Sequence, residues 1–85
     1  MIAHVWTISN GEYGMVLEGI GRMTISGHEA LINFILRMDV DKVVIDTERQ
    51  KNKPTGQKLH AQDMRDSIAM LYANRRGRRK NIVIE

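Results

Sequence analysis

The sequence predicts an α+β or small α/β fold, a single domain over residues 1–85 with one sheet built from an N-terminal β-hairpin and a βαβ unit. Three observations predict it. Residues 2–23 alternate around an Asn-Gly pair, two later segments have apolar residues at helical spacing, and a β-branched run lies on each side of the second of these segments. The expected order is ββαβαβ, with two helices packed on the sheet. A chain this short has room for one core only.

The hairpin occupies residues 2–23. Residues 2–9 alternate between the two faces of a strand, Asn10-Gly11 is typical of a type I′ turn, and residues 13–20 alternate again. Glycine is unfavourable inside a strand and often marks a bulge or a bend, which we therefore expect in the second arm. The glycines concerned are Gly14, Gly19 and Gly21.

A helix follows the hairpin. Ser26 is placed to cap it, Glu29 lies three positions on and completes a capping box, and Ile25 is placed for a hydrophobic staple. Apolar residues then recur at spacings of three and four, which gives one apolar stripe over about three turns. The stripe consists of Ala30, Leu31, Phe34, Ile35 and Met38.

The βαβ unit forms the second half of the chain. Residues 42–48 predict a strand buried on both faces, because Val43, Val44 and Ile45 are β-branched. Pro54 and Gly56 exclude regular structure from the basic loop 49–58. A second helix is expected over residues 59–76, ended by Gly77, before a short strand at 81–85. Its amphipathic face consists of Ala61, Met64, Ile68, Leu71, Tyr72 and Arg75.

If the last two strands are parallel, the loop 49–58 and the segment 75–80 lie at opposite ends of the second helix. The separation is then roughly 24 Å, at 1.5 Å of rise per residue. The two basic segments would be separate contact points, or the ends of one stripe that passes Arg65. An antiparallel last strand would change that geometry.

Positive charge is concentrated in two acid-free segments. Residues 75–80 hold five cations and residues 49–58 hold four, so nine of the 13 basic residues lie in 16 positions. Such clustering produces a local field suited to a phosphate backbone. We therefore expect a non-catalytic, weakly sequence-specific RNA-binding protein. The expected phosphate contacts are Arg75, Arg76, Arg78, Arg79 and Lys80, with Arg49, Lys51, Lys53 and Lys58 as auxiliary contacts.

Each basic segment also has a structural interpretation. One or two cations after a helix would be explained by the helix dipole, but five exceed that role. The loop 49–58 is equally typical of a solvated connection. The chain has only four aromatic residues, which argues against a binding mode in which successive bases stack on rings.

Composition excludes several classes of function. The chain has no cysteine, so it has no disulfide, thiolate zinc site or cysteine nucleophile, as is typical of an intracellular protein. The apolar run 31–36 is too short to cross a bilayer and no secretion signal opens the chain, so we expect a cytoplasmic protein without a membrane partner. His4, His28 and His60 lack the spacing of metal ligands, and we expect no metal or cofactor.

Residues 43–48, Val-Val-Ile-Asp-Thr-Glu, resemble the first motif of the proofreading 3′–5′ exonucleases, an apolar strand that ends in Asp-x-Glu and binds two metal ions. Residues 60–63 resemble a later segment of that family. Two-metal chemistry needs carboxylates from several elements, and the further acidic motifs have no counterpart in this chain. We therefore interpret Asp46 and Glu48 as residues that solvate a strand end, and expect a protein that is not an enzyme.

The compact, cysteine-free α/β character and the basic segment 74–80 resemble the small counter-defence proteins of T-even phages. Within that group the chain is similar in size and basicity to the inhibitory factor of the ToxN endoribonuclease. The resemblance rests on overall character and transfers no individual residue. It implies an RNA partner, a host endoribonuclease toxin as a second partner, and a location in the host cytoplasm.

Two further expectations concern protein partners. The competing hypothesis to RNA binding is a protein-binding inhibitor that docks on an acidic partner surface without nucleic acid. The last strand, with Ile82, Val83 and Ile84, leaves an edge able to pair with its copy, so we also expect a homodimer.

Overall fold

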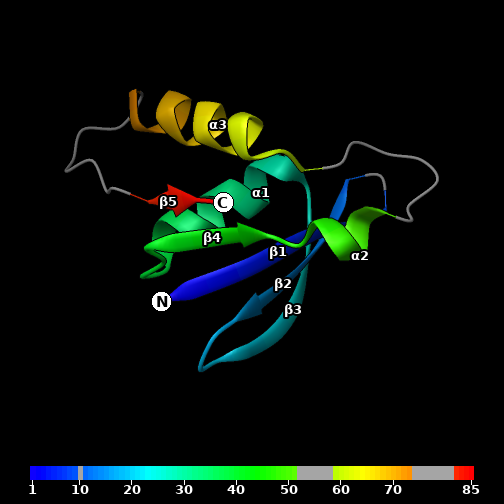
Figure 1. Ribbon diagram of the computed structural model, residues 1–85. Helices are drawn as coiled ribbons and strands as arrows, with labels where there is room; N and C mark the ends of the chain where they lie inside the picture. Colours follow the sequence, from blue (N-terminus) through cyan, green and yellow to red (C-terminus); the bar gives the residue numbers. More distant parts are fainter. Residues whose placement is uncertain (10, 52–58, 74–81) are drawn as a thin grey trace.

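The computed structural model describes residues 1–9, 11–51, 59–73 and 82–85, with the backbone alone at residues 51 and 71–73 (Figure 1). The described residues form one mixed sheet of five strands with three helices, which confirms the predicted α+β class and single sheet. No helix in this part of the chain is long and apolar enough to cross a bilayer. The elements are β1 Ile2–Ser9, β2 Glu12–Leu17, β3 Gly21–Ser26, α1 His28–Arg37, β4 Lys42–Ile45, α2 Thr47–Lys51, α3 Ala61–Ala73 and β5 Val83–Ile84.

The sheet has the order β3-β2-β1-β4-β5. β2 is antiparallel to both of its neighbours, whereas β4 is parallel to β1 and to β5. The parallel pair β4 and β5, joined through α3, confirms the predicted βαβ unit. Figure 1 shows α1 and α3 on the same side of the sheet, and α2 beyond the end of β4.

The core lies between the sheet and these two helices. Ala3 and Val5 of β1 and Met15 of β2 point into it and are fully buried, as are Leu31 and Ile35 of α1. Because strand side chains alternate, the intervening residues of β1 and β2 lie on the opposite face, which we call the open face. Trp6 belongs to the open face, yet it is only 4% exposed.

The glycine-rich second arm contains a complete turn rather than one bend. Gly19 has a φ of 84°, and the N–H of Ile20 donates to the carbonyl of Leu17 at 3.0 Å. The chain then returns as β3, a strand that the sequence interpretation did not separate from the hairpin. The bulge lies in β1 instead, where the register shifts between Thr7 and Ser9. Asn10 lies outside the described residues, so the predicted turn type is not assigned.

The predicted start of α1 and the predicted end of β4 differ from the observed ones. Ser26 ends β3, where it pairs with Glu12, and α1 therefore begins one residue later, after Gly27 (φ 97°), with no side-chain cap. The strand predicted to reach residue 48 ends at Ile45. There the carboxylate of Asp46 accepts a hydrogen bond from the N–H of Arg49 at 3.0 Å, which caps α2.

Candidate nucleic-acid interface

The basic residues predicted to contact phosphate lie mainly outside the described residues. This holds for the cluster Arg75, Arg76, Arg78, Arg79 and Lys80, for Lys53 and Lys58, and for the side chain of Lys51. Arg49 is described, in α2. The described residues that flank the two basic segments lie at the two ends of α3, since β5 is parallel to β4 as the predicted geometry required.

The described part of the chain is acidic. It contains six basic residues against all ten acidic ones, a net charge of −4. Residues 52–58 and 74–81 contain the other seven basic residues and no acid, a charge of +7, which restores the total of +3. The six are Arg22, Arg37, Lys42, Arg49, Lys51 and Arg65. Positive charge is thus concentrated in segments of the sequence that contain no acid.

A buried cycle of three hydrogen bonds joins the two ends of the segment 51–58. The N–H of Thr7 donates to Oε1 of Gln50 (3.1 Å), Nε2 of Gln50 donates to the carbonyl of Leu59 (2.8 Å), and the N–H of Leu59 donates to Oγ1 of Thr7 (3.2 Å). All three residues are at most 4% exposed. The cycle fixes the positions of Gln50 and Leu59, the residues that flank 51–58 in the sequence.

The helix between the basic segments is anchored by polar and apolar contacts. Arg65 donates from Nη2 to the carbonyl of Ile84 at 2.8 Å, which ties α3 to β5. His28 Nε2 lies 2.9 Å from Ser67 Oγ, which links α3 to the start of α1. Met64 and Ile68 of α3 are buried in the core. The position of α3 is therefore fixed relative to the sheet.

Arg49, one of the predicted contacts, is held over the open face of the sheet. Its guanidinium carbon lies 4.2 Å from the centroid of the Trp6 ring, and its Nε pairs with Oδ2 of Asp46 at 3.1 Å. Arg22 of β3 approaches the same ring, at 5.4 Å from its centroid. These distances are those of cation–π contacts, and they make Trp6, Arg22 and Arg49 one cluster.

The position of Trp6 depends on Gly14, its cross-strand partner. A Cβ added to Gly14 would collide with Cε2 and Cζ2 of the indole. Gly14, which was predicted to mark a bulge, is therefore in regular strand pairing. The indole ring occupies the space that a side chain at this position would fill.

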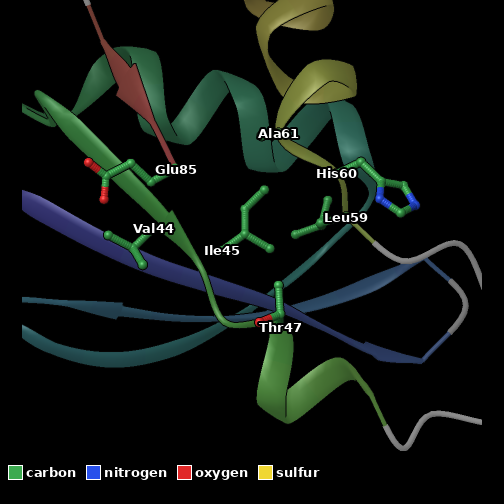
Figure 2. Close-up of a pocket in the computed structure, with 7 residues that line it drawn as sticks. All are labelled: Val44, Ile45, Thr47, Leu59, His60, Ala61 and Glu85. Atoms are coloured by element: carbon green, nitrogen blue, oxygen red, sulfur yellow. The ribbon is translucent and has the colours of Figure 1, made fainter.

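A pocket of about 350 Å³ lies at the carboxyl ends of β4 and β5 (Figure 2). Ile45 and Leu59 point toward each other in its centre, with Thr47 beside them, whereas the ring of His60 points away. Its lining is mainly apolar, and it adjoins the point where the basic loop returns. The lining residues are Val44, Ile45, Thr47, Leu59, His60, Ala61 and Glu85.

Asp46 and Glu48, which suggested exonuclease chemistry, have different environments. Asp46 caps α2 and pairs with Arg49, so both of its oxygens are engaged, and Glu48 is exposed in the first turn of α2. No group of three histidine, aspartate or glutamate side chains suited to a metal ion occurs within residues 1–9, 11–51, 59–73 and 82–85.

Arg49 was predicted from the sequence as a phosphate contact, but its contacts with Trp6 and with the neighbouring Arg22 were not predicted. Arg22 and Trp6 are 16 positions apart and meet through the register of three strands, which no local spacing indicates. The pairing of Trp6 with Gly14 offered one signal, since both alternate in phase within a predicted hairpin.

No protein-family model, curated protein or solved structure matches the chain.

Proposed function

We propose that the protein binds RNA with little sequence specificity, through the two basic segments 49–58 and 75–80. The observation that supports this most directly is the concentration of charge: +9 in residues 49–58 and 75–80 against −6 in the rest of the chain. The rest of the chain has a net negative charge and repels a phosphate backbone, so the basic segments make the main contacts. Arginine is favoured there because its planar fork binds phosphate through two hydrogen bonds.

The folded body supports this function by fixing residues that flank the two segments. The hydrogen-bond cycle of Thr7, Gln50 and Leu59 fixes Gln50 and Leu59, and the contact of Arg65 with Ile84 ties α3 to β5. RNA therefore contacts the protein at two points, one near each end of α3. On this proposal the protein binds RNA without catalysis and acts in the cytoplasm. If a phage encodes it, that cytoplasm is the host's, and a host endoribonuclease toxin is the expected target.

The test is RNA affinity as a function of salt. Each phosphate contact on a single strand contributes roughly −0.7 to the slope of log affinity against log salt. Changing Arg75, Arg76, Arg78 and Arg79 to Gln should abolish most of that slope and most of the affinity. The variant should keep its fold, with a stability change on the order of 1 kcal/mol.

A folded variant that binds RNA as tightly as the parent would contradict the assignment. A pull-down split into nuclease-treated and untreated halves separates the competing hypothesis. A protein partner that survives nuclease treatment supports an inhibitor docked on an acidic surface, and one that vanishes supports RNA.

A further inference from the structure

The cluster of Trp6, Arg22 and Arg49 places two arginines against one tryptophan ring, although covering the ring requires only one. Both guanidinium carbons lie near one indole, at 5.4 and 4.2 Å from its centroid, so they are at most the sum of these distances, 9.6 Å, apart. Like charges held this close repel each other. A cation over an aromatic ring gains about 0.5–1 kcal/mol at an exposed site, and one arginine would be enough for that.

The neutralising charge around these arginines is incomplete. Asp46 pairs through Oδ2 with Nε of Arg49 at 3.1 Å, and this is the one ion pair between the two arginines and a carboxylate of the described residues. Within the described residues Arg22 makes no ion pair, and it is exposed on β3. Lys42 of β4 differs, since its Nζ lies 3.3 Å from Oε2 of Glu85.

The scaffold below the two arginines is rigid. Trp6 is 4% exposed and lies against Gly14, and Arg49 is fixed by both the ring and Asp46. Arginines ordered in advance lose less entropy when they bind an anion. The α2 helix that presents Arg49 also leads directly into the basic segment 52–58.

We infer that Arg22 and Arg49, supported by Trp6, form a phosphate-binding site on the open face of the sheet. The site receives a phosphate group through the terminal guanidinium nitrogens, with hydrogen bonds assisted by charge. In identifying this phosphate as part of a bound RNA strand, the inference rests on the proposed function. It extends the RNA path from the basic loop across α2 onto β3.

Trp6 is the single tryptophan of the chain, so its emission reports on this site alone. The first experiment titrates the protein with inorganic phosphate against chloride at equal ionic strength. A saturable change in Trp6 emission is expected for the parent, and its loss in Arg22→Gln. The matched control is Arg37→Gln, which removes one exposed cation from the last turn of α1 and should keep the response.

The second experiment measures binding of single-stranded oligouridylate of about ten nucleotides, a length within the footprint of small single-strand binders. Arg22→Gln should weaken binding by about three- to tenfold and reduce the salt slope by about 0.7. Arg22→Lys should restore the slope, because it keeps the charge. Arg37→Gln should leave the slope unchanged.

The two experiments separate failure of the inference from failure of the proposed function. If oligouridylate binds through Arg75–Arg79 but Arg22→Gln changes neither the slope nor the phosphate response, Arg22 only packs on Trp6 and the inference is wrong. If oligouridylate does not bind while the phosphate response requires Arg22, the anion site stands and the RNA proposal is wrong. A parent without any phosphate response overturns the site.

Discussion

A single glycine determines where the indole of Trp6 lies. Trp6 and Gly14 face each other across β1 and β2, and the ring fills the position that any larger side chain would occupy. The ring is thereby buried on the face of the sheet that α1 and α3 do not cover, and it becomes the surface on which Arg22 and Arg49 are placed. The local requirement for glycine therefore comes from packing, since the backbone of Gly14 is not among those with positive φ.

Changing Gly14 to Ala should lower the free energy of unfolding by about 1–3 kcal/mol, as overpacking of a well-filled site does. Urea unfolding measures this change, and a shift of Trp6 emission should accompany it. Combined with Trp6→Phe, the same change should cost less than the sum of the two single variants, because a smaller ring relieves the collision. Strict additivity would show that the indole does not occupy the space at Gly14.

At the scale of elements, α2 is only five residues long and depends on its tertiary contacts. Asp46 caps its first turn, and Gln50 joins it to β1 and to the start of α3 through the buried hydrogen-bond cycle. Because Gln50 serves two backbone groups, its removal takes away one hydrogen bond from a buried donor and one from a buried acceptor.

Changing Gln50 to Leu keeps the size of the side chain but removes both of its hydrogen bonds. The N–H of Thr7 and the carbonyl of Leu59 would then lose the bonds that Gln50 makes to them, which should lower the free energy of unfolding by about 2–4 kcal/mol, at about 1–3 kcal/mol for each group. Denaturant unfolding measures the loss. The matched control is Gln62→Leu on α3, where an exposed hydrogen bond to Asp66 is lost and a change within about 0.5 kcal/mol is expected. Equal effects of the two variants would contradict the role of the cycle.

Helices and strands could be predicted from the sequence where one hydrophobic periodicity dominates. They could not be predicted where tertiary contacts determine which element forms. The stripe around Leu31 and Ile35 identified α1, and the β-branched run Val43 to Ile45 identified β4. The same run concealed α2, because Asp46 ends the strand through a capping bond that spacing alone does not distinguish from strand solvation. β3 was hidden because its residues follow a turn rich in glycine and only half of its alternation is apolar.

At the scale of the whole molecule, the sheet has two edges that differ. At the β5 edge Arg65 donates to the carbonyl of Ile84, so a neighbouring strand would have to displace this contact. The β3 edge is longer, with six residues against two. A homodimer that pairs through the strand at 82–84 would have to compete with the hydrogen bond of Arg65. The β3 edge is therefore the more favourable place for two copies to pair.

We predict a dimer in which β3 pairs with its symmetry copy in antiparallel orientation about Thr24. This register brings Met23 opposite Ile25 of the other copy and the two threonines opposite each other, with no like charges in contact. Thr24→Lys would place two cations opposite each other and should yield a monomer in light scattering at tens of micromolar protein. Val83→Lys, at an exposed position of the β5 edge, adds the same charge and should leave the dimer intact. A parent that is already monomeric at that concentration removes the dimer, and dissociation by Val83→Lys alone would transfer the interface to β5.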